Sequence, residues 1–319
     1  FVDRANYLSI IERLELEDGT LFAIPIVLST DDDTASQLNP YDKAAIVDSS
    51  DSTLAIIEIT DIFDREKEKE ARAVFKTTDE KHPGVERIYR GGNKCIAGPV
   101  WFFADAFQTP FPKYPSTPEA TRAAIEEKGW NTWVAFQTRH PVHRAHDYLQ
   151  KCAMEMVDGL LLHPIVGEIK EGDIPAEVRM KCYEILLENY YPKERVILGV
   201  LPAPMRYAGP REAIHHAIMR QNYGCTHIII GRDHAGVGGY YGTFDAQKIF
   251  DEIDSSKLLV QPIKFAHAFY CKKCGQMASV KTCPHEAEQR VFLSGTKVRE
   301  KLKNGEDLPP EFTRHEVSE

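Results

Sequence analysis

Between residues 113 and 263 the chain alternates short apolar runs with segments of helical periodicity, and this alternation constrains its fold more than any other feature. Because the pattern is typical of βαβ units, it predicts an α/β fold with a parallel sheet. Strands are expected at 133–136, 159–166, 195–200, 226–230 and 258–263. Helices are expected at 117–128, 143–157, 175–190, 210–223 and 244–253. Ligands of such sheets bind beyond the carboxyl ends of the strands, so the residues that follow each strand are the first candidates for a site.

The regions on either side of this α/β region have different patterns. The first 112 residues contain strand and turn patterns, with strands expected at 21–28 and 53–59, and a cluster of prolines follows. After residue 263 the strand–helix rhythm is lost. A chain of 319 residues is long enough for about two domains. We therefore predict a β-rich N-terminal domain at 1–112, an α/β domain at 113–263 and a small C-terminal region at 264–319.

Composition excludes several classes of protein. The chain has 39 Lys and Arg against 48 Asp and Glu, a formal charge of −9, whereas a general nucleic-acid coat needs a basic surface. It has no run of 18 apolar residues, so no membrane span is expected. Its seven cysteines are too few and too unevenly placed for a disulfide framework, and a reducing cytoplasm is the predicted compartment.

The segment QTRHPVHRAH, residues 137–146, follows one expected strand and begins a helix. Arg139 is a planar cation that can hold a tetrahedral anion by paired hydrogen bonds. His143 and His146 are three residues apart, so they share one face near the N-terminus of the helix, where backbone N–H groups favour phosphate. The segment predicts a polyphosphate site; the alternative is a pair of surface or zinc-ligating histidines.

Three further segments also suit anions. GRDHAGVG, residues 231–238, follows a second apolar strand; its glycines let the backbone approach a ligand, and Arg232 brings a second cation to the same sheet edge. The alternative is a glycine turn with an arginine in solvent. SGTKVR, residues 294–299, either meets phosphates or is an ordinary capped helix start. For MRYAGPRE, residues 205–212, structural and nucleotide-contacting roles are both open.

A cysteine cluster predicts a metal site of another kind. Cys271 and Cys274 form a CxxC pair, and Cys283 and His285 follow. Three thiolates and one imidazole suit tetrahedral Zn²⁺ without an open catalytic position, so the metal is expected to hold an irregular segment together. His285 is the expected fourth ligand and His267 the alternative. A reduced CxxC pair without metal is the other interpretation.

Taken together, these motifs resemble the ATP sulfurylase, or sulfate adenylyltransferase, family, in particular its prokaryotic zinc-containing type. The likeness extends in family order to LEDGTLFAIPI at 16–26 and to PPEFTR at 309–314. It implies a β-rich N-terminal domain, here incomplete at its start, and a catalytic α/β domain of the nucleotidylyltransferase (Rossmann-like) type. A small zinc-bearing C-terminal region completes the expected architecture. The resemblance also implies a homodimer without a kinase domain.

The same resemblance implies a reaction, in which a sulfate oxygen attacks the α-phosphorus of ATP and forms adenosine 5′-phosphosulfate and diphosphate. It assigns sulfate binding to Gln137, Arg139 and the backbone of Ala235, and charge stabilisation in the transition state to Arg232. Thr138 and His140 are placed between the two halves of the site. The family commonly has Asn at position 140, so the role of this imidazole stays open.

ATP is assigned to a larger set of residues by this resemblance. His143 and His146 are expected to meet the β- and γ-phosphates, with Mg²⁺ accompanying the nucleotide on few or no protein ligands. The other expected ATP-binding residues are Gly231, Asp233, His234, Val291 and Phe292. For His234, a role in shaping its loop is the alternative.

Two other functions compete with this interpretation. The same fold permits an adenylyltransferase with a different acceptor, because fold does not fix function. A nucleic-acid-binding module built on the cysteine cluster is opposed by the charge of −9 and the absence of a basic, aromatic-rich strip. The sequence leaves the direction of the reaction open between sulfate assimilation and ATP formation during sulfur oxidation.

Overall fold

The computed structural model describes residues 1–319 except 104, 105, 107, 108, 169–172, 292–296, 299, 302, 303 and 319. The chain forms two compact units, and it passes between them several times. Unit 1 consists of Phe1–Pro112, Arg206–Ile218 and Asp233–Leu258. Unit 2 consists of Lys113–Met205, Met219–Arg232 and Leu259–Glu319. We describe the two units separately, and the boundaries predicted after residues 112 and 263 stay predictions.

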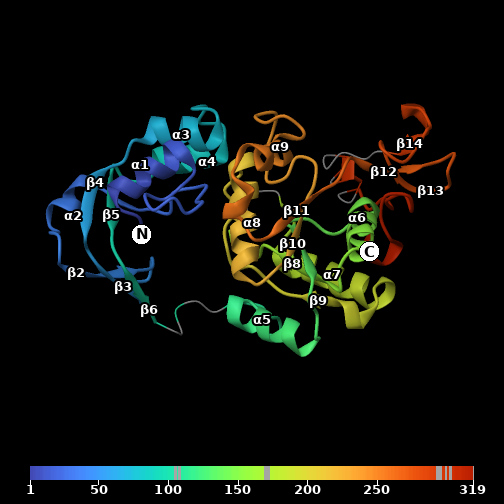
Figure 1. The fold of residues 1–319 in the computed structure, drawn as a ribbon, viewed down its shortest axis with the longest axis horizontal. Coiled ribbons are helices and arrows are strands. Elements are labelled where there is room, and N and C mark those ends of the chain that lie inside the picture. The colour runs from blue at the N-terminus through green and yellow to red at the C-terminus, as the bar shows by residue number, and fades with distance from the viewer. Residues whose placement is uncertain are drawn as a thin grey trace. The chain divides into compact units, whose positions relative to one another are not determined.

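Unit 2 contains a parallel five-stranded sheet, as the alternating pattern predicted (Figure 1). Its order is β11 (Gln261–Lys264), β10 (His227–Ile230), β7 (Trp133–Thr138), β8 (Gly159–Pro164) and β9 (Val196–Leu198). Every residue of β8 is buried, which is typical of a strand whose sheet is covered on both faces. Leu160, Leu161 and Leu162 are completely buried and form the centre of this sheet.

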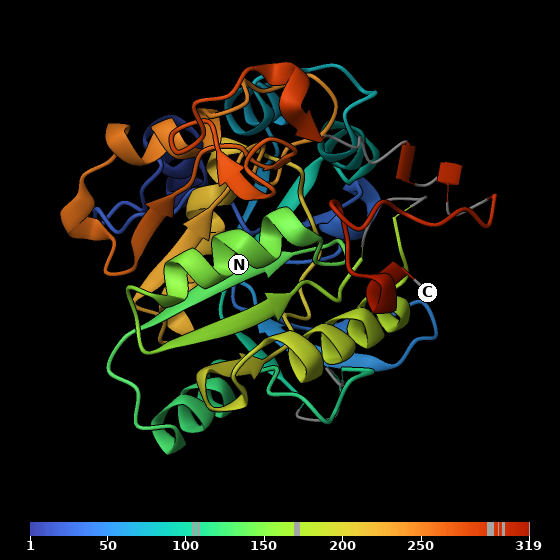
Figure 2. The same ribbon diagram turned by 90° about the vertical axis from the view of Figure 1, so that its right-hand side faces the viewer.

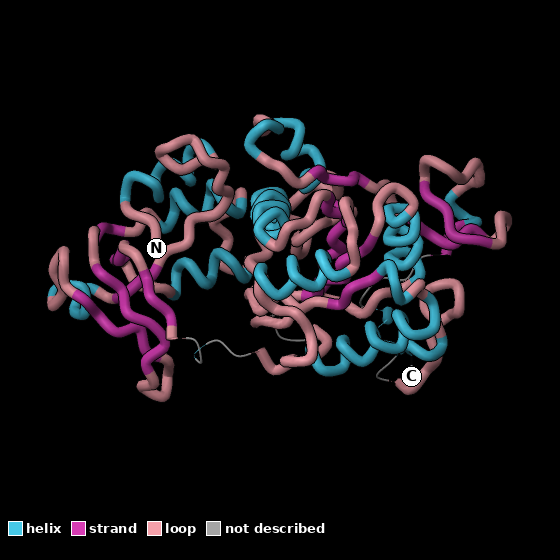
Figure 3. The backbone as a smooth tube through the Cα atoms, turned by 60° about the horizontal axis from the view of Figure 1, so that its bottom comes forward, coloured by secondary structure: helices cyan, strands magenta, loops and turns pink. Residues whose placement is uncertain are grey.

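The helices that connect these strands alternate with them along the chain (Figure 3). They are α5 (Pro118–Glu127), α6 (Arg144–Met154), α7 (Ala176–Tyr190), α8 (Pro210–Asn222) and α9 (Asp245–Glu252). The sequence explains how α5 begins, because the Thr117 side chain accepts a hydrogen bond from the Ala120 N–H and Pro118 supplies the first turn. The strand and helix prediction for this region is confirmed in element order, with boundaries shifted by a few residues.

The order of strands reverses once, between β7 and β10. From β7 the chain passes through α6 to β8 and through α7 to β9, so both crossovers lead away on the same side of β7. Because such crossovers are right-handed, α6 and α7 cover the same face of the sheet (Figure 2). The chain then returns to form β10 on the other side of β7. This reversal creates a topological switch point at the carboxyl ends of β7 and β10.

Unit 1 contains two antiparallel three-stranded sheets, so the prediction of a β-rich N-terminal region is confirmed. Its strands are β1 (Leu28–Thr30), β2 (Lys43–Val47), β3 (Thr53–Glu58), β4 (Asp61–Asp64), β5 (Lys94–Ala97) and β6 (Val100–Phe102). Its helices before residue 112 are α1 (Arg4–Arg13), α2 (Asp32–Ser36), α3 (Lys67–Phe75) and α4 (Pro83–Arg90). The strand expected at 21–28 is wrong: Leu21 makes a single bridge to Glu15, and Pro25 has no N–H to give to a ladder.

The region after residue 263 is a small antiparallel sheet of order β13-β12-β14, which the sequence did not predict. Its strands are β12 (Ala268–Cys271), β13 (Gln276–Ser279) and β14 (Arg290–Val291). Gly275 makes the hairpin turn at φ 67°, and its N–H donates to the Cys271 carbonyl at 2.9 Å. Short elements complete the chain: α11 (His315–Ser318) and the 3-10 helices Lys193–Arg195, Ser255–Lys257 and Ala287–Gln289. Among the described residues, no helix combines the length and apolar character needed to cross a bilayer.

Candidate active site and metal centre

The switch point of unit 2 brings two of the predicted segments to one sheet edge. β7 ends at Thr138 and β10 ends at Ile230, and the two strands pair in parallel. Arg139 follows the first strand, and Gly231 and Arg232 follow the second. Since the carboxyl ends of neighbouring parallel strands lie at the same edge, residues distant in sequence become neighbours there. The sequence argument located this edge correctly.

A tight turn after β7 shapes this edge. The Thr138 hydroxyl accepts a hydrogen bond from the His140 N–H at 3.0 Å and donates to the His140 carbonyl at 2.8 Å. The Tyr183 hydroxyl donates to the same carbonyl at 2.8 Å, and burial raises the pKa of Tyr183 to about 12. Thr138 and the backbone of His140 therefore hold the turn that carries Arg139. A direct catalytic role for either residue stays a prediction.

Arg139 pairs with a carboxylate that the sequence did not single out. Its Nε lies 3.6 Å from Oδ2 of Asp173, and both side chains are largely buried. The pair holds a guanidinium at the end of β7, where a planar cation suits a tetrahedral anion. Beside it, the Gln137 Oε1 atom is buried and has no hydrogen-bond partner among the described residues. Sequence analysis assigned Asp173 no role in the site, because nothing in the spacing links it to Arg139.

The two histidines of the α6 segment stack on each other. The ring centroids of His143 and His146 are 3.8 Å apart with planes at 24°, which confirms that they share one face. The Phe312 ring stacks on His143 at 4.8 Å, and Phe136 contacts His146 at 5.4 Å. The Nδ1 atoms of both imidazoles are buried without a hydrogen-bond partner in the described part of the chain. Buried polar atoms are normally paired, so these two are candidates for contact with a ligand.

Burial keeps this pair of imidazoles uncharged. Desolvation lowers the pKa of His146 to about 4. It lowers the pKa of His143 well below the usual range, and the positive charges of His146, His140, Arg232 and His267 act in the same direction. Both rings are therefore neutral at pH 7, and each carries one N–H donor and one acceptor nitrogen.

Phe312 also closes part of the helix N-terminus. Its carbonyl accepts a hydrogen bond from the Arg144 N–H, the first of α6, at 2.9 Å. Two residues on, Arg314 bonds to the Asp147 carboxylate at 2.8 Å. One of the backbone donors expected for phosphate is thus occupied by the chain itself. Sequence analysis assigned Phe312 no role in the site, although Phe312 lies in the PPEFTR segment that carries part of the family resemblance.

Arg232 belongs to unit 2, and its side chain is exposed. Its positive charge lowers the pKa of two histidines. It contributes to the lowered pKa of His143 and to that of His267, which burial, Arg232 and Arg290 together lower to about 4. Next to it, Gly231 has no atom within 4 Å of the place where a Cβ would stand, so the backbone is open on that side. His267 is thereby placed in the electrostatic field of Arg232.

The remaining ATP-binding candidates of unit 2 are only partly described. Val291 lies in β14 and pairs with Tyr270 of β12, with its side chain half-buried. Phe292 and most of the SGTKVR segment lie outside the described residues. The predictions for these positions stay as they were.

Asp233, His234 and Ala235 belong to unit 1 and form a strained loop there. Asp233 and Ala235 have left-handed backbones, with φ 53° and 54°. The Gly209 N–H donates to the Ala235 carbonyl at 3.1 Å, and the His234 Nε2 atom lies 3.1 Å from the Nδ1 atom of His216. The loop therefore has its own supports within unit 1.

The cysteine cluster is assembled as predicted. The ligand atoms of Cys271, Cys274, Cys283 and His285 all lie within 4.8 Å of one another. The His285 Nδ1 atom is 3.3, 3.2 and 3.7 Å from the three sulfurs in that order, and the sulfurs of Cys274 and Cys283 are 3.8 Å apart. Tetrahedral zinc with bonds of about 2.3 Å to sulfur and about 2.1 Å to nitrogen needs ligand separations of this size. His267 is not part of the group, so His285 completes the donor set among the described residues.

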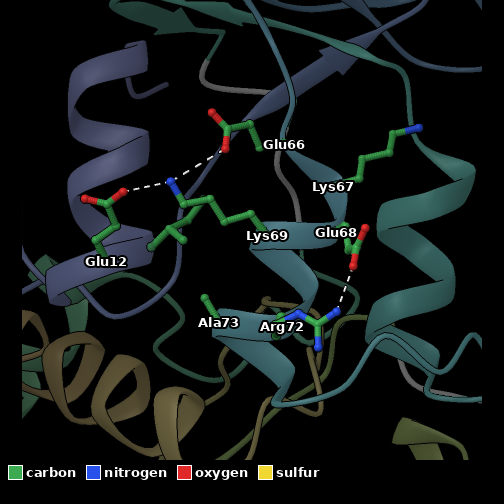
Figure 4. Close-up of a pocket in the computed structure, with 8 residues that line it drawn as sticks. Glu12, Glu66, Lys67, Glu68, Lys69, Arg72 and Ala73 are labelled. Atoms are coloured by element: carbon green, nitrogen blue, oxygen red, sulfur yellow. Dashed lines mark hydrogen bonds and ion pairs between the residues drawn. The ribbon is translucent and has the colours of Figure 1, made fainter.

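A charged hollow of about 710 Å³ lies between α1 and α3 of unit 1 (Figure 4). Lys69 lies 2.7 Å from Glu12 and 3.6 Å from Glu66, and Arg72 pairs with Glu68 at 2.7 Å. These charges neutralise one another, and the hollow contains none of the predicted site residues.

Comparison with known proteins identifies the family. The ATP-sulfurylase family model matches residues 112–319, and a PUA-like domain model matches residues 1–105. A sulfate adenylyltransferase of Acaryochloris marina is 52% identical over 318 residues, covering 100% of this chain and 82% of the relative. One of Deinococcus radiodurans is 53% identical over 319 residues, covering 100% and 81%.

A solved structure shares the fold over nearly the whole chain. It is described as a hexameric APS kinase from Thiobacillus denitrificans, and it superposes with a TM-score of 0.73 at 23% identity. The match covers 99% of this chain and 56% of the solved one, and at this identity it bears on the fold alone. The family model and the relatives, with identity above 50% along its whole length, decide the assignment: the chain belongs to the ATP-sulfurylase family.

Proposed function

We propose that this chain is a sulfate adenylyltransferase, which transfers the adenylyl group of ATP to sulfate and releases diphosphate. The observation that carries the proposal is the collection of anion-binding groups at the switch point of unit 2. Arg139 and Arg232 follow the two strands that meet there, and the neutral pair His143 and His146 stands at the start of the next helix. Relatives over 50% identical carry the same activity in their names.

The reaction needs charge stabilisation more than proton transfer. A sulfate oxygen forms a bond to the α-phosphorus, the bond from that phosphorus to the bridging oxygen breaks, and diphosphate leaves with the electron pair. Both reactants are anions and no proton has to move in this step, so positioning and electrostatics supply the catalysis. Neutral imidazoles, which donate N–H groups without a change of protonation, fit this requirement.

We assign the roles of individual residues from the family resemblance, and their positions support these assignments. Arg139, held by Asp173, and the NH₂ group of the Gln137 amide are the proposed sulfate-binding groups of unit 2, and the family resemblance adds the backbone of Ala235. Arg232 stabilises the charge that builds up in the transition state. His143 and His146 donate to the departing diphosphate.

The other assigned residues complete the proposal. Thr138 and His140 form the turn that orients Arg139. The nucleotide contacts that remain are assigned to Gly231, Asp233, His234, Val291 and Phe292. Mg²⁺ enters with ATP or diphosphate and neutralises phosphate charge there.

We also propose that the cysteine cluster holds a structural zinc ion. The four donors fit a closed tetrahedral site, and such an ion stabilises a hairpin that is too small to have a large core of its own. Metal analysis should find about one zinc per chain, since four ligands take one ion. A strong chelator should lower the melting temperature of the wild-type protein but not that of a Cys274→Ser variant prepared without metal. Normal melting of protein that contains no metal would contradict the proposal.

By the same family resemblance, we propose that the protein works as a homodimer in the cytoplasm. Light scattering of the purified protein measures its mass directly. A mass near that of one chain, 36.1 kDa, at micromolar concentration would contradict the dimer.

The first experiment runs the reaction toward ATP, its favourable direction. Protein, adenosine 5′-phosphosulfate, diphosphate and Mg²⁺ are mixed, and ATP is measured by the light of a coupled luciferase. We expect a signal that requires diphosphate and disappears in the Arg232→Ala variant. Folded, metal-loaded protein without signal would contradict sulfate as the acceptor, and diphosphate release from ATP would then be screened with other oxyanions.

A further inference from the structure

Glu212, which has no role in the proposed reaction, is a buried carboxylate at the start of α8 in unit 1. Its Oε1 atom accepts a hydrogen bond from the Arg206 N–H at 2.8 Å and its Oε2 atom accepts one from the Ala208 N–H at 2.9 Å. Oε1 also lies 3.3 Å from the Nε2 atom of His216, one helical turn later. A completely buried carboxylate needs such donors, because removal from water is costly unless hydrogen bonds replace it.

His216 connects the Glu212 carboxylate to His234 of the glycine-rich segment 231–238. If its Nε2–H donates to Glu212, the Nδ1 atom of a neutral ring is an acceptor. That Nδ1 atom lies 3.1 Å from the Nε2 atom of His234, which must then carry the proton of this second hydrogen bond. The carboxylate therefore selects one tautomer in both rings, in the same way that a carboxylate orients a histidine that binds a metal.

The loop around His234 needs such support. Asp233 and Ala235, on either side of it, both have left-handed backbones, a conformation that is unfavourable for a residue with a side chain and persists only where neighbours hold it. The Ala235 carbonyl accepts from the Gly209 N–H at 3.1 Å, and Gly209 adjoins Ala208, which Glu212 holds. Glu212 thus supports the loop from two sides, through Ala208 and through His216.

We propose that Glu212 and His216 are positioning residues that fix the Nε2-protonated tautomer of His234 and so hold Ala235 in its left-handed conformation. Their effect on sulfate rests on the proposed function, in which the backbone of Ala235 contributes to sulfate binding. Their effect on His234 is a property of the protein without substrate and is measured independently of activity.

The deciding experiment is therefore spectroscopic. Protein with ¹⁵N-labelled histidine is examined at pH 8 by two-bond ¹H–¹⁵N correlation, with the two rings assigned from His216→Gln and His234→Gln variants. We expect both His216 and His234 to be protonated on Nε2 in the wild-type protein, and the Nε2-protonated fraction of His234 to fall in Glu212→Gln. An Nδ1-protonated His234 in the wild type, or an unchanged tautomer in Glu212→Gln, would overturn the proposal. The wild-type spectrum decides even if the variant does not fold.

Kinetics test the consequence for the site. His216→Ala should raise the KM for sulfate about tenfold with a smaller effect on the KM for ATP. Ala235→Gly in the same chain should recover at least about threefold, because glycine adopts the left-handed backbone without strain. His215→Ala is the matched control, since His215 is the neighbouring buried histidine of α8 and contacts the Phe22 ring instead.

The outcomes separate the two hypotheses. A loss of melting temperature in His216→Ala, with an unchanged sulfate KM and no recovery by Ala235→Gly, would make His216 a packing residue only and overturn the proposal. If His216 and His234 have the expected tautomers but the protein does not transfer adenylyl groups, the proposed function is contradicted. The proposed positioning of His234 would still stand.

Discussion

Two pairs of histidines in this chain have opposite environments. His143 and His146 of unit 2 are stacked, buried and neutral, and their Nδ1 atoms have no partner among the described residues. His216 and His234 of unit 1 contact each other through ring nitrogens, and Glu212 anchors the first of them. The first pair therefore has ring nitrogens that no described residue satisfies, whereas the ring nitrogens of the second pair belong to a chain of hydrogen bonds.

The difference indicates two kinds of contribution to the proposed reaction. A buried donor or acceptor without a partner destabilises a fold by about 1–3 kcal/mol, so its persistence points to a ligand that satisfies it. A satisfied pair stabilises its surroundings and fixes the position of a loop. Changes at the first pair should therefore remove activity with a smaller loss of stability, whereas changes at the second should lower stability and substrate binding together.

The largest effect is expected from Arg232→Ala, which removes the cation whose charge reaches His143. Loss of a group that stabilises transition-state charge lowers kcat by about 10²–10³-fold, and we expect the upper end of this range for a full charge. Arg232 is exposed, so the urea midpoint of unfolding should not change. Turnover within tenfold of wild type would show that the cation does not act on the reacting phosphate.

His143→Ala tests the unsatisfied pair directly. It should lower kcat by about 100-fold, as loss of one preorganised donor to the diphosphate does. Its unfolding free energy should fall by less than that of His216→Ala, because His143 loses only packing whereas His216→Ala also removes one of the three N–H groups that face the buried Glu212 carboxylate. Urea unfolding of the two variants, beside their steady-state kinetics, makes the comparison. The reverse order of stability loss would remove the distinction between the pairs.

Sequence patterns predicted the parallel sheet and the sheet edge at which Arg139 and Arg232 follow their strands, because both depend on local periodicity. Apolar strands followed by charged residues place Arg139 and Arg232 at strand ends whatever the details of packing. The cysteine cluster is equally local, since all four ligands lie within 15 residues, 271–285. Folding decided between His285 and His267, because the hairpin turns His285 back onto the sulfurs while His267 lies in the field of Arg232.

The contacts that escaped prediction join residues distant in sequence. Asp173 contacts Arg139, and Phe312 contacts His143, because folding brings these distant residues together. Their spacing in the sequence predicts neither contact. In the N-terminal region, the sequence analysis missed α1, although this helix buries Tyr7, Ile10 and Ile11. The apolar run at 21–28 includes Ala23 and Ile24, which are buried in the core. Its apolar composition resembles that of a strand, although residues 21–27 form none. Burial and strand periodicity cannot be told apart in a run this short.

Arg139→Ala extends the comparison to the sulfate-binding groups proposed for the switch point. It should raise the KM for sulfate about 50-fold, because hydrogen bonds to a charged group contribute about 1.5–3 kcal/mol, and should leave the KM for ATP nearly unchanged. Initial rates over a matrix of both substrates measure the two constants. Asp173→Asn, which keeps the shape but not the charge of the partner, should change the sulfate KM in the same direction by less. Equal changes in both KM values would mean that Arg139 holds the whole site and not sulfate in particular.

The smallest expected effect is a dependence of the unfolding free energy on pH that His146 of the stacked pair causes. The pKa of His146 is about 4 in the folded protein and about 6.5 in the unfolded chain, so below pH 6.5 the unfolded chain takes up a proton that the folded protein does not. Stability is therefore lost as pH falls from 6.5 toward 4, and the loss between pH 7.5 and 5 is about 2 kcal/mol, or about 30-fold in the folding equilibrium.

This dependence is measured by urea unfolding of wild type and His146→Gln at both pH values. Other titrating groups act in both proteins, so the difference between the two pH dependences isolates His146. We expect the variant to lose about 2 kcal/mol less than wild type over this range. Equal dependences in wild type and His146→Gln would mean that His146 is protonated normally in the folded state, and the neutral pair on which the proposed chemistry of diphosphate release depends would be lost.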